Sequence, residues 1–335
     1  MNGLPVSVVK GVGCARLTLV VLALLLVTLS RVSAASSPQT IEWYMIDLPP
    51  IQNQTGVERG QGYTDWIRWR LVAGLDGYRH VLRLSNVHRM LHDLEIKPNI
   101  CNTAFLRTEA RERFMVYADP LHAQFPNGIA VQRMRLESDY AAYLDGNGAF
   151  EINALAQAGA GVIAVQSGRS YGAEIDAAIA HARKDDRVFT ITTNHRPMDA
   201  KFGLLRAGRV DVLPLYPYEF SYHLRGSTFA DTIAFLPVEG NAVYTLNHLA
   251  CSRSALGDEV IAASNPLIAE ERDGYFAAAY RHWLPDSMRP LHARHHHHAF
   301  GSDLVDQEFH PFPGDEFIAE CMLTGGAWYN GACER

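Results

Sequence analysis

The sequence predicts an α/β protein built on mostly parallel sheets. Short apolar runs typical of strands alternate, over most of the chain, with stretches whose apolar residues recur at helical spacing. About 300 residues follow an N-terminal leader, which is enough for two domains of ordinary size. In such sheets ligands bind beyond the carboxyl ends of the strands. The residues that follow each strand are therefore the first candidates for a site.

The N-terminus has the pattern of a secretory signal peptide. Lys10 and Arg16 give it a positive start, and a 13-residue apolar run, interrupted only by threonines, covers 17–29. Small residues follow at 32–34, where a signal peptidase would cleave. A membrane anchor is the competing interpretation, but the run is short against the roughly 20 residues of a spanning helix. We predict that residues 1–34 are removed and that the protein is periplasmic.

The mature chain is acidic. Removing the leader takes away three basic residues and no acidic ones, so the formal net charge changes from −6 to −9. An acidic surface gives no electrostatic support for nucleic-acid binding. We expect no nucleic-acid partner and no cofactor.

The predicted elements follow one another in a regular order. Strands are expected at 41–46, 80–85, 99–105, 161–166, 188–193 and 210–216, and helices at 62–75, 87–95, 108–114, 170–183 and 198–207. From residue 285 proline, histidine and glycine become frequent and the periodicity fades. We predict an irregular tail over 285–335.

The tail contains five histidines in seven residues. Such a segment can bind zinc, copper or nickel loosely. The weak candidates for metal ligands are His295, His296, His297 and His298. A solvated linker explains the run as well and is the favoured interpretation, so we expect no metal site there.

Four cysteines follow the leader: Cys101, Cys251, Cys321 and Cys333. An even number in an oxidising compartment suggests two disulfides, with four free thiols as the alternative. Three pairings are possible. The short separation of Cys321 and Cys333 favours a local bridge, which leaves Cys101 to pair with Cys251.

Several segments keep a particular order along the chain. IEWYMIDLPPI is followed by GQGYTDW, NICNTAFLRTEARERFMVYADPL, GVIAVQSGRSYGAEID and GRVDVLPLYPYEF. In this order they resemble the type 2 periplasmic solute-binding proteins of the amino-acid-binding class (solute-binding protein family 3). The likeness covers roughly residues 41–284. Asn86 and Arg89, with the two mid-chain cysteines, make the chain similar to a proteobacterial branch of that family.

The resemblance implies a two-lobe periplasmic-binding-protein type 2 fold, and a monomer, as is usual for binding proteins of this kind. Each lobe would be a mostly parallel sheet flanked by helices, and two crossover strands near 128–133 and 242–248 would join them. Lobe one would comprise 36–130 plus 245–284, and lobe two 131–244. Cys101 and Cys251 would then both lie in lobe one.

The resemblance also implies a site between the lobes. The counterpart of Arg111 grips the α-carboxylate of the ligand, a task that suits the planar fork of arginine; the alternative is a surface arginine. Gly168, Arg169 and Ser170 lie between a strand and a helix, where backbone amides and a hydroxyl can hold an anion. Simple capping by Ser170 is the alternative.

Other positions depart from the family pattern. Tyr216 stands where amino-acid binders carry an aspartate for the ligand's ammonium, and Glu219 is three residues further on. A tyrosine does not supply that full negative charge, so an anionic solute fits as well as an amino acid. Arg89, Asp47 and Tyr63 are further candidates, because each follows a strand end or opens a helix.

The sequence therefore predicts a periplasmic protein that clamps a small polar or anionic solute, an amino acid or a carboxylate. It would deliver the solute to a membrane permease or present it to a sensor. A catalytic role is not favoured, because neither a GxSxG nor an HExxH motif is present. The remaining alternatives are a metal-handling protein and a non-catalytic interaction protein on the same fold.

Overall fold

The computed structural model describes residue 3 and residues 37–192, 197–305, 308–312 and 314–335. The chain divides into two compact units, 1–38 and 39–335, and only the second is discussed below. The predicted signal peptide lies outside the described residues apart from residue 3, so it stays a prediction. No helix in the described part of the chain is long and apolar enough to cross a membrane.

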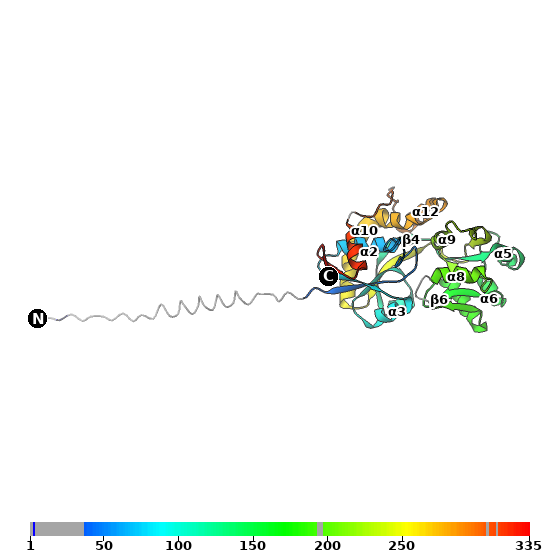
Figure 1. Ribbon diagram of the computed structural model, residues 1–335, viewed down its shortest axis with the longest axis horizontal. Helices are drawn as coiled ribbons and strands as arrows, with labels where there is room; N and C mark the ends of the chain where they lie inside the picture. Colours follow the sequence, from blue (N-terminus) through cyan, green and yellow to red (C-terminus); the bar gives the residue numbers. More distant parts are fainter. Residues whose placement is uncertain (1–2, 4–36, 193–196, 306–307, 313) are drawn as a thin grey trace. The chain divides into compact units, whose positions relative to one another are not determined.

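Lobe one is built on a seven-stranded sheet (Figure 1). In spatial order its strands are β12 (Ala332–Glu334), β11 (Ala327–Tyr329), β2 (Arg79–Leu84), β1 (Thr40–Met45), β3 (Ile100–Leu106), β10 (Thr245–Ser252) and β4 (Met115–Gln124). β1 pairs in parallel with β2 and β3, whereas β10 runs antiparallel to β3 and β4. The sheet is thus mixed rather than mostly parallel. β10 enters it as the return from lobe two, and β11 and β12 are joined by a tight turn that reverses the chain.

Helices cover both faces of this sheet, with α2 and α10 on one side and α3 on the other (Figure 1). The helical segments of lobe one are α2 (Tyr63–Gly74), α3 (Val87–Ile96), α4 (Glu109–Glu112), α10 (Ala255–Glu271), the π-helical turn η4 (Arg272–Phe276), α11 (Ala277–His282), η5 (Asp286–Met288), α12 (Arg289–Phe300) and α13 (Asp315–Leu323). Two of them begin at side-chain caps. Asn86 accepts a hydrogen bond from the Arg89 amide at 2.9 Å, and Ser254 accepts one from the Gly257 amide at 2.9 Å.

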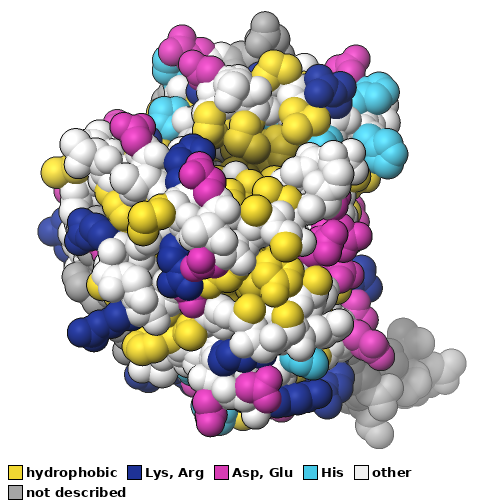
Figure 2. Space-filling view, turned by 90° about the vertical axis from the view of Figure 1, so that its right-hand side faces the viewer, with side chains coloured by type: hydrophobic (Ala, Val, Ile, Leu, Met, Phe, Trp, Pro, Cys, Tyr) yellow, Lys and Arg dark blue, Asp and Glu magenta, His cyan; other side chains and the backbone are white. Residues whose placement is uncertain are grey.

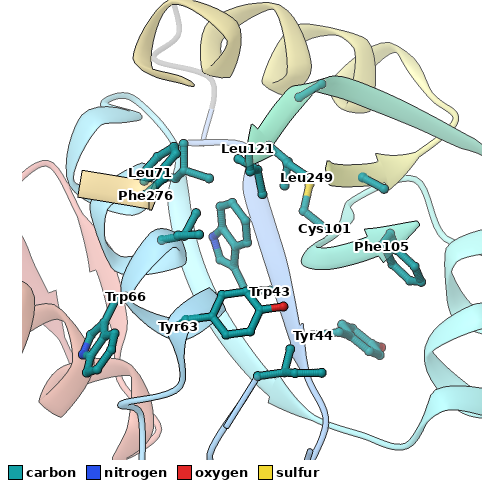
Figure 3. Packing of buried hydrophobic residues seen from close by; sticks show 14 of the residues in the cluster. Trp43, Tyr44, Tyr63, Trp66, Leu71, Cys101, Phe105, Leu121, Leu249 and Phe276 are labelled. Carbon is teal, nitrogen blue, oxygen red and sulfur yellow. The ribbon is translucent and has the colours of Figure 1, made fainter. Parts of the chain in front are cut away.

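The core of lobe one is rich in aromatic side chains. Figure 3 shows Trp43 of β1 among side chains of α2 and Phe276 of η4, with Leu249 of β10 on the other side. Trp43 and Phe276 are fully buried. Because burial of large aromatic side chains is a main source of stability, this cluster fixes β1 against α2. The end of β1 and the start of α2 both face the cavity described below.

Lobe two is smaller and has two short sheets. β5 (Gly128–Gln132) lies antiparallel between β8 (Leu213–Leu215) and β9 (Ile233–Leu236), while β6 (Ile163–Gln166) pairs in parallel with β7 (Val188–Ile191). A parallel bridge between Ile163 and Val212 connects the two sheets. The helical segments are α5 (Arg133–Ser138), η1 (Ala141–Tyr143), α6 (Ile152–Gln157), α7 (Ala173–Ala182), η2 (Arg183–Asp185), α8 (Pro197–Arg206), α9 (Pro217–Leu224) and η3 (Ala230–Thr232).

The strand pairing indicates where the lobes divide. β4 ends at Gln124 in the first sheet, and β5 begins at Gly128 in the second, so the chain crosses at 125–127. It returns between Leu236 of β9 and Thr245 of β10. We propose these crossovers in place of 128–133 and 242–248, which puts β5 in lobe two.

The described residues of the tail include regular elements, contrary to the sequence prediction of an irregular segment over 285–335. α12 and α13 are helices, and β11 extends the first sheet by pairing with β2. The helical periodicity of this segment is hidden in the sequence because histidine is polar, yet His292 and His296 are fully buried. They form the inner face of α12 against β4 and η4 rather than a solvated linker.

Both predicted disulfides are confirmed. Cys101 and Cys251 face each other across the β3–β10 pair with their Cα atoms 4.1 Å apart, and we call this bond the core disulfide. Cys321 and Cys333 join α13 to β12 with a Cα separation of 5.7 Å, and we call this bond the tail disulfide. The core disulfide links segments 150 residues apart, so it ties the return strand β10 to β3.

Candidate functional site

A small cavity, the cleft cavity, lies where the strand ends of lobe one meet lobe two. Its volume is about 70 Å³, far below the roughly 300–1,000 Å³ of pockets for drug-sized ligands. The lining residues are Ile46, Leu48, Ile51, Tyr63, Val87, Met90, Ala104, Phe105, Leu106, Arg111, Gln124, Gly168, Arg169, Ser170, Tyr216 and Asn247. Apolar side chains predominate, and the cations among the lining residues are two arginines. The cavity is therefore suited to a small solute with negative charge.

Arg111 lines the cleft cavity, as the family resemblance implies. It follows β3 and belongs to the single turn α4, so its half-buried guanidinium points back toward the strand end. Nη1 donates to the Leu106 carbonyl at 3.2 Å, and the guanidinium carbon lies 5.3 Å from the centre of the Phe105 ring. Burial lowers the pKa of Arg111 from its ordinary value. Among the described residues no carboxylate forms an ion pair with it, so its charge is available to an anion.

Arg169 also lines the cavity, but its positive charge is balanced by the carboxylate of Glu219. Nη1 and Nη2 donate to Oε1 and Oε2 of Glu219 at 2.8 and 2.6 Å, a bidentate pair. The side chains of Arg169 and Glu219 are 8% and 0% exposed. Burial alone would raise the pKa of the carboxyl, but the Arg169 charge outweighs burial and holds the pKa of Glu219 below its usual value. Glu219 itself does not line the cavity.

The loop after β6 carries Gly168 and Ser170 into the cavity wall. Gly168 adopts a φ of +76°, and a Cβ there would lie 3.0 Å from Val87 of the other lobe. The Ser170 hydroxyl donates to Asp176 Oδ2 at 2.6 Å, and the Tyr171 amide donates to Asp176 Oδ1 at 2.9 Å. Asp176 in the first turn of α7 thus fixes the loop, and Ser170 Oγ can still accept a hydrogen bond from a solute.

Tyr63 and Tyr216 approach from opposite lobes. Gln124, at the end of β4, bridges them: the Tyr63 hydroxyl donates to Gln124 Oε1 at 3.3 Å, and Gln124 Nε2 donates to the Tyr216 hydroxyl at 3.1 Å. The Tyr63 and Tyr218 hydroxyls are 3.2 Å apart. Burial raises the pKa of both Tyr63 and Tyr216, so these phenols stay neutral. The tyrosines close the cavity with polar but uncharged groups.

Two further predicted site residues, besides Glu219, do not line the cavity. Arg89 is exposed on α3, and its Nε is 3.8 Å from Asp93 Oδ2 on the same helix. Asp47 is buried after β1 and accepts a hydrogen bond from the Gln54 amide at 3.3 Å. Neither lines the cleft cavity. Their assignment as ligand-binding residues stays a prediction that this arrangement does not favour.

The sequence interpretation missed Gln124, Asn247 and Lys201. Asn247 of β10 is 3% exposed, lines the cavity, and its Oδ1 has no hydrogen-bond partner in the described part of the chain. Lys201 of α8 is fully buried, and burial together with the nearby Arg169 guanidinium lowers its pKa to about 7. The sequence signal for such residues is a polar side chain inside an apolar strand or helix face.

Further contacts join the lobes around the cavity. The Tyr222 hydroxyl of α9 donates to Glu58 Oε2 of lobe one at 2.7 Å. On the other side of the cavity His88 of α3 is hydrogen-bonded to the Ser167 hydroxyl of lobe two. Each contact is made between side chains at the lobe surfaces and would break if the lobes moved apart. The structure therefore represents a closed arrangement.

A larger hollow lies on the crossover side and has a different character. It measures about 540 Å³ and is lined mostly by apolar side chains of the crossovers, α9, β9 and α12, Val238 and Leu291 among them. Figure 2 shows hydrophobic side chains gathered in a recess of this face beside several histidines. No charged side chain belongs to its lining. A polar or anionic solute would gain little there, so the cleft cavity is the candidate site.

The histidine segment holds no metal centre in the described residues. His295 and His296 are buried, and His296 Nε2 lies 2.9 Å from Asp273 Oδ1. His297 instead contacts Asp303 and His298 contacts Tyr244, so neighbouring histidines turn to different partners. In the part of the chain that the structure describes, no group of three or more His, Cys, Asp or Glu side chains could bind a metal ion.

The two lobes, the double crossover and the cavity between them define a periplasmic-binding-protein type 2 fold. Solved structures agree with this class. An ancestral arginine-binding protein bound to arginine superposes with a TM-score of 0.55 at 15% identity, covering 73% of this chain and 98% of that chain. A mutant of ArgBP from T. maritima gives a TM-score of 0.53 at 15% identity, with 74% and 96% covered.

A histidine kinase sensor domain with similarity to periplasmic binding proteins also gives a TM-score of 0.53, at 16% identity, with 73% and 96% covered. No protein-family model and no curated protein matches the chain. At these identities the likeness applies to the fold. It confirms the two-lobe architecture expected from the ordered sequence segments.

Proposed function

We propose that the protein is an exported solute-binding protein that closes its two lobes around a small polar or anionic solute. The observation that carries the proposal is Arg111, a half-buried guanidinium in the interlobe cavity with a backbone carbonyl as its protein hydrogen-bond acceptor. A desolvated charge of this kind is stabilised by an ionised partner, and a bidentate carboxylate matches its shape.

Closure would couple binding to a change in shape. Contacts such as Tyr222 with Glu58 form only when the lobes meet, and a solute that bridges the lobes favours that state. The closed form would then deliver its solute to a membrane permease or present it to a sensor. This use is supported by a fold shared with both binding proteins and a sensor domain.

The test is a thermal-shift screen of the mature protein, residues 35–335. The protein is unfolded and refolded with its disulfides intact, so that no bound solute remains, and is screened against amino acids, carboxylates, polyamines, phosphates and metal ions. A solute present at a hundred times its dissociation constant adds about 2.7 kcal/mol to the free energy of unfolding. The shift should disappear in Arg111→Gln.

Arg113→Gln is the matched control. Arg113 is exposed, is two positions away, and its Nε donates to the Ala110 carbonyl of its own turn. Its replacement should leave the shift unchanged. A panel in which no solute raises the melting temperature would refute the proposed function.

A further inference from the structure

We infer that the solute is a short-chain monocarboxylic acid that carries a hydroxyl group and no ammonium group, such as a 2-hydroxy acid. This inference rests on the proposed function and narrows it to a chemical class. It departs from binding of a zwitterionic amino acid. Three properties of the cleft cavity carry it: its charge, its unpaired polar atoms and its apolar wall.

Among the described residues that line the cavity, Arg111 is the cation without an ionic partner. Two arginines line it, and no Asp or Glu does among the described residues. Arg169 is neutralised by Glu219, whose Oε1 and Oε2 both accept from its guanidinium and whose Oε2 also accepts from the Tyr216 amide. Glu219 does not line the cavity, so its charge is balanced within lobe two. Arg111 remains with its single carbonyl contact. One carboxylate on the solute balances this charge, and a second would be buried without a partner.

An ammonium group finds no counter-charge in the cavity. Asp176, in the open depression that adjoins the cavity, has both oxygens engaged by the loop that contains Ser170. Tyr216, which lines the cavity, is a neutral phenol that already accepts from Gln124. Three ammonium donors close to the Arg111 charge would be poorly satisfied.

Asn247 supplies the partner for a hydroxyl group. Its Oδ1 is an orphaned acceptor, and the side chain is 3% exposed. In the β3–β10 pair Asn247 is in register with Leu106, the residue whose carbonyl holds Arg111. The amide and the guanidinium therefore lie at the same end of the cavity. A carboxylate with a hydroxyl on the adjacent carbon can bind both, because its oxygen atoms are close together.

The rest of the wall suits a short carbon chain. Ile46, Leu48, Val87, Met90 and Phe105 contribute apolar surface. With a cavity of about 70 Å³, a solute with few non-hydrogen atoms fits this closed arrangement, whereas a long side chain does not.

Titration calorimetry with three isosteric probes tests the inference on the unmodified mature protein. L-lactate, L-alanine and propionate differ at one position, which carries a hydroxyl, an ammonium or a hydrogen. L-lactate should bind, L-alanine should bind at least about a hundredfold more weakly, and propionate about tenfold more weakly. In Asn247→Leu the preference for lactate over propionate should disappear, while Arg111→Gln should abolish binding of both acids.

The outcomes separate this inference from the function on which it rests. Binding of L-alanine as tight as that of L-lactate would overturn the inference and leave solute binding intact. Binding of a polyamine, a phosphate or a dicarboxylate in place of lactate would do the same. Failure of every solute in the wider thermal-shift panel would overturn both.

Discussion

The buried pair of Arg169 and Glu219 provides the most direct test of the electrostatics of lobe two. Replacing Glu219 with glutamine keeps the shape and an oxygen that can accept from the Tyr216 amide, but it removes the charge. The Arg169 guanidinium, 8% exposed, would then lie buried without a counter-charge. Removing one partner of such a pair costs about 3–5 kcal/mol of the free energy of unfolding. In a protein of this size that corresponds to a melting temperature lower by roughly 6 °C or more.

The assay is chemical denaturation followed by circular dichroism, with Glu112→Gln as the matched control. Glu112 pairs with Arg107 at 2.6 Å, but the two side chains are 40% and 59% exposed. This variant should change the free energy of unfolding by about 1 kcal/mol or less. A Glu219→Gln loss no larger than that of the control would refute the reasoning. A double variant with Arg169→Met should recover part of the loss, because no unpaired charge remains.

Three further predictions concern stability. Replacing both cysteines of the core disulfide with alanine should lower the free energy of unfolding by about 5 kcal/mol, and the same change in the tail disulfide by about 3 kcal/mol. The difference arises because the two bonds close loops of 150 and 12 residues. Urea unfolding of the two variants checks this order. Burial lowers the pKa of His122 and His292 to about 3, so the unfolded chain binds more protons below pH 6.5. Stability should therefore fall by about 1.4 kcal/mol per histidine for each pH unit from 6.5 toward 3, and His122→Phe should flatten this slope in melts at pH 5 and 7. Gly257→Ala should destabilise α10, since the new Cβ would lie 2.0 Å from a backbone oxygen. Gly203→Ala, in α8, meets no atom within 4 Å and should raise the melting temperature slightly. Equal changes in melting temperature for the two variants would contradict the prediction.

Much of the fold could be predicted because it depends on local patterns. The strand predicted at 99–105 is β3 at Ile100–Leu106, and the helix predicted at 87–95 is α3 with Asn86 as its cap. Arg111 could be placed because it follows a strand end in a recognisable order of segments. The lobe division that we propose differs from the predicted one by a few residues, because β5 is apolar like β4 and only strand pairing assigns it to a sheet.

The chemistry of the site depended on contacts that no local pattern contains. Arg169 and Glu219 are 50 residues apart, and each alone resembles a ligand-binding residue. Pairing cancels their charges and changes the expected solute. Asn247 stands out locally only as a polar residue in an apolar strand, and its role depends on an orphaned acceptor in a folded cavity. Burial of the α12 histidines likewise follows from tertiary packing that overrides side-chain polarity.

The hairpin of β11 and β12 has a consequence for aggregation. β11 occupies the outer edge of β2, whose residues include the buried Val81 and the exposed Leu84. Without the hairpin β2 would present a row of unpaired backbone groups, a template for pairing with another chain. The tail disulfide anchors this cover to α13. The last ten residues thus protect the edge strand β2 from pairing with another chain. Reduction of the tail disulfide should promote self-association at high protein concentration before it affects the cleft cavity.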